Sequence, residues 1–154
     1  MVVGAAAASV KSFKAAVAAG LGQLKGTGAK HIVVAVADSL PLTALHGEAL
    51  AACANEANYV YRHTKPSSPM APAMVRFTLV CAKAQARDVA AGLQRGSAIA
   101  AGVTLARECA NRPGNVCTPT FLGEQARRLG KEHGLKVEVL DRKAVEKLGM
   151  GAFL

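Results

Sequence analysis

One short segment constrains the fold of this chain more than any other. Residues 31–37, His-Ile-Val-Val-Ala-Val-Ala, form a continuous run rich in β-branched residues, bounded by Gly28 and by the turn Asp38-Ser-Leu-Pro41. A run of this kind predicts a strand that is buried on both faces, in the middle of a sheet. Residues 74–82 predict a second strand, and the alternation of apolar and charged residues at 135–140 predicts a third.

Helix patterns separate these runs. Apolar residues at three- and four-residue steps predict a helix over residues 5–24. A second helix is expected over 41–63 with Ser39 as a possible N-cap, and a long alanine-rich helix over 84–111. Thr118 and Pro119 predict the start of a helix that ends at Gly134, and Asp141 is expected to cap a short helix ending at Gly149. Strand and helix alternate, so the fold class is α/β, with a parallel or mostly parallel sheet covered by helices.

Three glycines inside the expected long helix carry a further prediction. Gly92, Gly96 and Gly102 each cost about 1 kcal/mol relative to alanine in a helix. Their presence predicts a close approach of another backbone, or a bend.

Composition bounds the function classes. The 154 residues, 51% of them hydrophobic, suffice for one domain or parts of two. A net charge of +9 is spread over scattered lysines and arginines, so neither a nucleic-acid site nor a membrane partner is predicted. No stretch approaches the ~20 apolar residues that span a bilayer, and no basic segment precedes the apolar start. An intracellular, cytoplasmic location is expected.

The four cysteines are expected to be buried, reduced thiols, since none forms a Cys-x-x-Cys pair; they are Cys53, Cys81, Cys109 and Cys117.

Local motifs for chemistry are weak. The segment Gly26-Thr-Gly28-Ala-Lys30 follows an expected helix and precedes an expected strand. A phosphate-binding loop follows a strand and precedes a helix, so this segment is interpreted as a connecting turn. Surface or packing roles are expected for the histidines, and surface or capping roles for four carboxylates. These residues are His31, His46, His63 and His133, and Asp38, Glu48, Glu56 and Asp141. No catalytic, cofactor-binding or metal-binding residue is therefore predicted in this sequence.

The second half of the chain carries a family resemblance. Residues 96–122, GSAIAAGVTLARECANRPGNVCTPTFL, look like the linker helix and following segment of the leucine aminopeptidase, or cytosol aminopeptidase, family. Asn111-Arg-Pro-Gly-Asn-Val-Cys-Thr-Pro119 is similar to that family's asparagine- and proline-rich turn. Val137-Glu-Val-Leu-Asp141 and Lys147-Leu-Gly-Met-Gly-Ala152 resemble the first strand and turn of its catalytic domain. The first part, including residues 31–37 and 59–65, is similar to the second half of the family's N-terminal α/β domain.

This resemblance implies an organisation and an activity. It implies a partial N-terminal α/β domain at 1–83, a linker helix at 84–111 and the truncated start of a catalytic peptidase domain at 112–154. Family members are hydrolases that release N-terminal amino acids from peptides with two divalent metal ions, Mn or Zn, and assemble as hexamers. The family's metal-binding motifs are expected downstream of Leu154, so the chain alone is expected to be inactive and to bind no metal. The alternative is a non-catalytic α/β interaction or regulatory domain with a basic surface.

Overall fold

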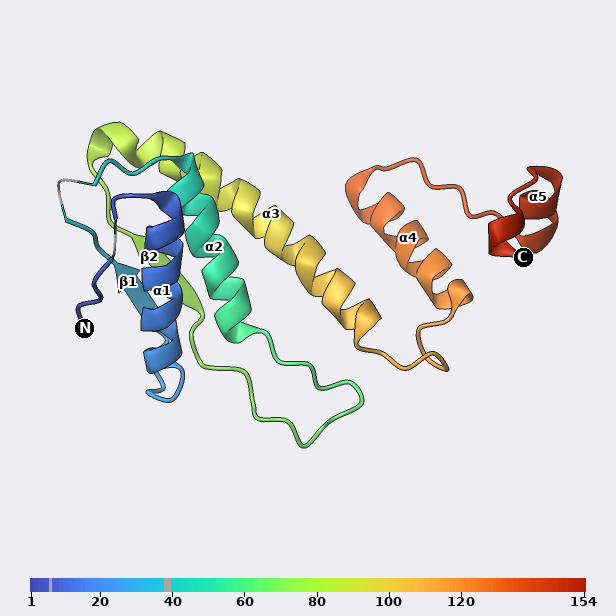
Figure 1. Ribbon diagram of the computed structural model, residues 1–154, viewed down its shortest axis with the longest axis horizontal. Helices are drawn as coiled ribbons and strands as arrows, with labels where there is room; N and C mark the ends of the chain where they lie inside the picture. The colour runs from blue at the N-terminus through green and yellow to red at the C-terminus, as the bar shows by residue number, and fades with distance from the viewer. Residues whose placement is uncertain (6, 38–39) are drawn as a thin grey trace. The chain divides into compact units, whose positions relative to one another are not determined.

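The structure is a computed structural model that describes residues 1–5, 7–37 and 40–154 (Figure 1). The chain divides into two compact units, Met1–Glu108 (unit 1) and Cys109–Leu154 (unit 2). The fold is mixed α/β and mostly helical, with one small parallel sheet of two strands in the described residues. No helix in this part of the chain is long and apolar enough to cross a membrane.

The sheet of unit 1 contains strands β1 (His31–Val34) and β2 (Arg76–Leu79), which pair in parallel with Ile32 opposite Phe77. Side chains alternate, so Ile32 and Leu79 face the core. The prediction that the first strand is buried on both faces is wrong, since Val33 is 56% exposed. The physical reason is that, among the described residues, helices cover one face only and neither strand has a second neighbour.

Two helices supply the core that packs on this sheet. Helix α1 (Val10–Leu24) begins at Ser9, whose hydroxyl accepts a hydrogen bond from Ser12 N at 3.2 Å. Helix α2 (Ala44–Asn58) lies beside it (Figure 1). The two helices bury a common apolar layer. The buried apolar residues of this layer are Phe13, Val17, Leu21, Ala49, Leu50, Cys53 and Ala57. The predicted helix 5–24 is confirmed over most of its length.

Helix α2 is shorter than the prediction of 41–63. It begins after Thr43, which is extended, and the predicted cap Ser39 lies outside the described residues. It ends at Asn58 because Tyr59 is extended and the Asn58 amide donates to the carbonyl of Met74 at 2.7 Å. That side-chain bond ties the end of the helix to the segment leading into β2.

Helix α3 (Ala86–Ala110) follows β2 through a short 3₁₀ turn, η1 (Lys83–Gln85), and packs against α2. The prediction of close backbone approach is confirmed at two glycines. A Cβ on Gly92 would strike the carbonyl oxygen of Ala44, and one on Gly96 would lie 2.8 Å from Glu48 Cα. Gly102 makes no such approach, since nothing lies within 4 Å of its Cβ position. Only the first half of α3 therefore needs glycine for its contact with α2.

Unit 2 contains helices α4 (Pro119–His133) and α5 (Arg142–Lys147) and a terminal 3₁₀ turn, η2 (Gly151–Phe153). The predicted caps are confirmed. Thr118 Oγ1 accepts from Phe121 N at 3.2 Å, Gly134 ends α4 with a φ of 68°, and Asp141 Oδ1 accepts from Ala144 N at 2.8 Å.

The predicted strand at residues 135–140 is not formed. A strand needs a neighbour to pair with its backbone, and none lies beside this segment among the described residues. The segment packs instead on α4: the Cβ position of Gly130 is 2.8 Å from Val137 Cγ2, and that of Gly123 is 3.0 Å from Val139 Cγ1. The alternating valines thus lie over two glycines that are seven residues apart on one helix face.

Candidate functional site

The histidines do not come together in the fold. His31 lies on the exposed face of the sheet, where its Nε2 is 2.9 Å from Thr78 Oγ1. His46 is buried at the start of α2, while His63 and His133 are exposed. In the part of the chain that the structure describes, no group of three or more His, Cys, Asp or Glu side chains could hold a metal ion.

The carboxylates that the sequence singles out serve structural contacts. Glu48 accepts from Arg95 at 2.7 Å and Glu56 from Arg107 at 2.6 Å, so both acids of α2 are paired with arginines of α3. Asp141 caps α5, and Asp38 lies outside the described residues. A carboxylate held by an arginine is a poor general base because the pairing favours its charged form.

The cysteines form no disulfide among the described residues. Cys53 is buried, as predicted, whereas the prediction of burial is wrong for Cys81, Cys109 and Cys117, which are half-buried. Burial raises the pKa of the Cys53 thiol; Lys14 lowers it and Glu56 raises it to smaller extents. The thiol lies 3.5 Å from the carbonyl oxygen of Lys14, to which it donates. A buried thiol with a raised pKa is a weak nucleophile at neutral pH.

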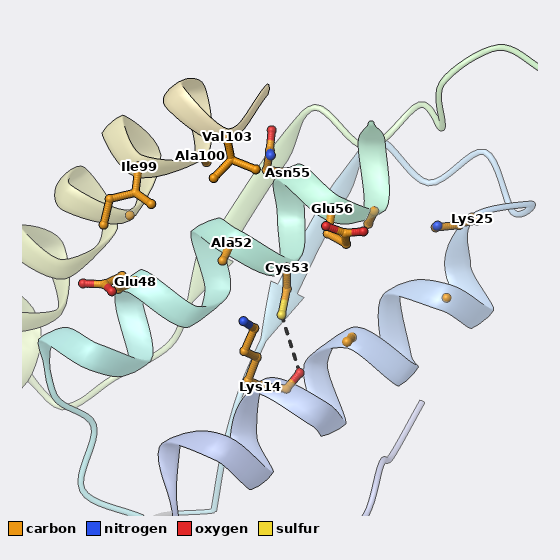
Figure 2. A pocket seen from close by; sticks show the side chains of 14 residues that line it. Lys14, Lys25, Glu48, Ala52, Cys53, Asn55, Glu56, Ile99, Ala100 and Val103 are labelled. Carbon is orange, nitrogen blue, oxygen red and sulfur yellow. Dashed lines mark hydrogen bonds between the residues drawn. The ribbon is translucent and has the colours of Figure 1, made fainter. Parts of the chain in front are cut away.

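A hollow of about 530 Å³ lies between α1, α2 and α3 of unit 1 (Figure 2). Figure 2 shows Cys53 of α2 pointing towards α1, and Ile99 and Val103 lie on the α3 side. Small residues make the space; they are Ala18, Gly22, Ala52, Ala57, Gly96 and Ala100. Sequence reasoning missed this hollow, and its only signal was the excess of alanine and glycine in the three helices. Its walls contain no nucleophile and base in contact, so they support binding and no hydrolytic chemistry.

Known proteins resemble this chain along nearly all of it. The family model "Cytosol aminopeptidase family, catalytic domain" matches residues 104–154. A protein of Methylibium petroleiphilum named "Probable cytosol aminopeptidase" is 57% identical over 147 residues, which cover 96% of this chain and 30% of that protein. One of the same name from Polaromonas naphthalenivorans is 41% identical over 156 residues, covering 100% of this chain and 30% of that protein. The chain belongs to the cytosol aminopeptidase family.

Solved structures share the fold of this chain. The bottromycin maturation enzyme BotP superposes with a TM-score of 0.73 at 26% identity, covering 96% of this chain and 32% of that one. A structure of BotP in complex with Mn has a TM-score of 0.62 at 24% identity, covering 82% and 25% of the two chains. A mutant of tomato leucine aminopeptidase shares the fold, with a TM-score of 0.73 at 22% identity over 94% of this chain and 29% of that one. The chain spans about 30% of the length of its curated relatives.

The match to the cytosol aminopeptidase catalytic domain begins inside α3, at Thr104. This last part of α3 is bound to α2 within unit 1. Thr104 Oγ1 donates to Asn55 Oδ1 at 2.9 Å, and the Arg107 guanidinium pairs with Glu56 and lies 5.2 Å from the centre of the Tyr59 ring. The helix therefore remains attached to the preceding core up to Arg107, three residues short of its last residue.

Proposed function

We propose that this chain is the N-terminal portion of a metal-dependent leucyl aminopeptidase that releases N-terminal amino acids from peptides. The observation that carries the proposal is the 57% identity with a cytosol aminopeptidase over 96% of the chain. Because these residues span 30% of that relative, the activity belongs to the whole protein. The 154 residues by themselves are inactive in this proposal.

The proposal includes a domain organisation. Residues 1–83 form a partial N-terminal α/β domain, residues 84–111 a linker helix, and residues 112–154 the start of the catalytic peptidase domain, with 135–140 as its first strand once a neighbouring strand is present. Two observations support this organisation: the catalytic-domain match begins at residue 104, and the division between the two units falls at residues 108 and 109. Both lie near the end of α3, which ends at Ala110.

In this proposal, metal ions are bound and used only by the whole protein. Two divalent ions, Mn or Zn, would activate water and polarise the scissile carbonyl. The described residues do not fit such a centre, since they contain no suitable cluster of ligands and Glu48 and Glu56 are paired with arginines. No catalytic step is therefore assigned to a side chain of this sequence. BotP in complex with Mn supports manganese as the first metal to test.

Partners and location complete the proposal. The substrates are peptides with a free N-terminus, the assembly of the whole enzyme is a homo-hexamer, and its compartment is the cytoplasm. The name shared by the relatives supports the location and the peptide substrates. No nucleic-acid or membrane partner is part of the proposed function.

A chimera tests this function. In the Methylibium petroleiphilum protein, the segment that aligns with this chain is replaced by these 154 residues. Hydrolysis of leucine p-nitroanilide is then measured with added Mn or Zn. The chimera is expected to turn over the substrate and to lose that activity with a chelator, whereas the 154 residues alone show none.

The unmodified relative and a chimera carrying Gly92→Leu serve as controls. The substitution pushes a side chain into the carbonyl of Ala44, so the variant chimera is expected to be insoluble or inactive. A well-folded hexameric chimera without metal-dependent turnover would contradict the proposal. Metal-dependent turnover by the 154 residues alone would contradict the location of the active centre.

A further inference from the structure

His46 combines burial with an unusual position in the first turn of a helix. Its side chain is 4% exposed and its ring lies edge-on to Phe13 of α1, with 5.1 Å between the ring centres. It occupies the third position after the N-cap Thr43, where a capping box usually has glutamate or glutamine. Here the imidazole takes that role, because Nδ1 accepts a hydrogen bond from the backbone N–H of Thr43 at 3.1 Å.

This bond determines which ring nitrogen holds the proton. A backbone N–H can only donate, so Nδ1 must offer a lone pair and the neutral ring carries its hydrogen on Nε2. The hydroxyl of Thr43, 3.0 Å from Nδ1, can donate to the same lone pair. Nε2 is buried and finds no hydrogen-bond partner among the described residues. The site thus fits a neutral imidazole and offers little to a charged one.

The turn that His46 caps is also where α2 meets α3. The Ala44 N–H donates to Asp88 Oδ2 at 3.1 Å, and the carbonyl of Ala44 lies directly against Gly92. The next residue, Gly47, packs against the Val89 carbonyl, and its Cβ position is 2.8 Å from Leu93 N. Loss of the first turn of α2 would therefore release the closest backbone contacts between the two helices.

We propose that His46 is a pH-sensitive latch, which holds the first turn of α2 and its crossing with α3 only while the imidazole is neutral. Protonation of Nδ1 removes the acceptor for the Thr43 N–H. In the described part of the chain, the only nearby acceptor for the new Nδ1–H is the Thr43 hydroxyl oxygen. The resulting cation stays buried against Phe13, near the positive end of the α2 dipole. This inference concerns unit 1 and does not depend on the proposed peptidase activity.

Few charged groups lie close to the latch. On α3, the Asp88 carboxylate accepts from the N–H of Ala44, two residues before His46. On α1, Lys14 follows Phe13, whose ring contacts His46. The segment 40–43, Leu-Pro-Leu-Thr, contributes no charge, and Glu48 of α2 is paired with Arg95. Burial lowers the pKa of His46 from its ordinary value of 6.5.

The sign of the pH effect follows from this lowered pKa. Above pH 6.5 the ring is neutral in both the closed and the frayed turn, and the latch is fully effective. Below pH 6.5 the imidazole binds a proton in the frayed turn but not in the closed turn. The equilibrium constant for opening the turn therefore rises by up to about tenfold per pH unit. The effect levels off once the buried ring itself is protonated.

Amide hydrogen exchange tests the latch on the 154-residue chain. Protection factors of the His46 and Gly47 amides, corrected for intrinsic exchange, are compared at pH 7.5, 6.0 and 5.0. They are expected to fall between pH 6.0 and 5.0, by at most about tenfold. In His46→Gln they should change less than about twofold, because glutamine can accept from the Thr43 N–H without titrating. His31→Gln, on the exposed face of the sheet, should behave like the wild type.

A direct measurement keeps the test decisive if the glutamine variant does not fold. The ring nitrogens of ¹⁵N-labelled wild-type histidine report both the tautomer and the titration of His46. A hydrogen on Nε2 at neutral pH and a titration midpoint below 6.5 support the proposal. A hydrogen on Nδ1, a midpoint at or above 6.5, or an unchanged acid effect in His46→Gln would overturn it.

Discussion

The two units differ in how far they bury their apolar side chains. Unit 1 has a core that contains Leu50, which is 0% exposed, together with large apolar side chains from α1 and β1 and small ones from α2. Unit 2, all of which is described, buries only Gly130. Several of its apolar side chains remain well exposed, Leu122, Leu148 and Phe153 among them. Unit 1 therefore gains its stability from burial, whereas unit 2 depends mostly on helix caps and local contacts.

The glycines show the same contrast. In unit 1, Gly92 and Gly47 meet the backbone of a neighbouring helix, which cannot move without disturbing the core. In unit 2, Gly123 and Gly130 meet chiefly the side chains of Val139 and Val137, although a Cβ on Gly130 would also lie 3.0 Å from the Leu135 carbonyl oxygen. A side-chain neighbour can turn aside, so a glycine in unit 2 is expected to tolerate alanine better.

The largest effect is expected from Leu50→Ala. Removing this fully buried side chain should lower the free energy of unfolding by about 2–5 kcal/mol, through lost burial and the cavity left behind. Urea denaturation followed by tyrosine fluorescence measures it, because both tyrosines, Tyr59 and Tyr61, lie in unit 1 and the chain has no tryptophan.

Leu122→Ala is the matched control for this change. Leu122 is on α4 and 47% exposed, so the same truncation should cost less than about 1 kcal/mol and leave the tyrosine transition unchanged. Equal losses at the two positions would remove the distinction between the units.

The crossing of α2 and α3 gives the next largest effect. Gly92→Ala should destabilise unit 1 by about 1–3 kcal/mol, since the new methyl group meets the Ala44 carbonyl. Gly102→Ala, in the same helix with open space around it, should instead stabilise by up to about 1 kcal/mol through helix propensity. Thermal unfolding of the two variants, measured side by side, should give shifts of opposite sign. If the unfolding temperatures of Gly92→Ala and Gly102→Ala shift in the same direction, the contact with α2 does not determine the effect of an added methyl group on α3.

Helix caps give a smaller effect that can be compared between the units. Thr118→Ala on α4 and Ser9→Ala on α1 each remove a side-chain acceptor from a helix start and should cost about 1 kcal/mol. Circular dichroism at 222 nm should record both, while tyrosine fluorescence should record only Ser9→Ala. A fluorescence change in Thr118→Ala would mean that the units do not unfold separately.

The smallest effects are expected for two ion pairs, the first of them between Arg107 and Glu56. The two side chains are 35% and 66% exposed, so a double-mutant cycle with alanine should give a coupling below about 1 kcal/mol. The pair Arg142–Glu146 of α5, 3.1 Å apart, should give about 0.3–0.5 kcal/mol. Added salt should reduce both couplings. A loss of stability in Arg107→Ala that exceeds the coupling and resists salt would show that Arg107 also acts through its packing on Tyr59.

Local signals in the sequence account for most of the elements. Apolar spacing predicted α1, and the pair Thr118 and Pro119 predicted the start of α4 at the right residue. Asp141 was recognised as a cap for the same reason, because a cap depends on residues only a few positions away. The strand predicted at 135–140 fails because a strand requires a partner that no local pattern supplies.

The sequence by itself determined the alternation of helix and strand from α1 to α3, the caps and the family resemblance, since these depend on neighbours in the chain or on ordered motifs. Only the tertiary structure decided which glycines touch a neighbour, that Val33 is exposed, and that His46 is buried as a cap. Each of these depends on residues far away in sequence that packing brings together. Periodicity describes one element at a time, whereas burial and protonation depend on the elements packed around it.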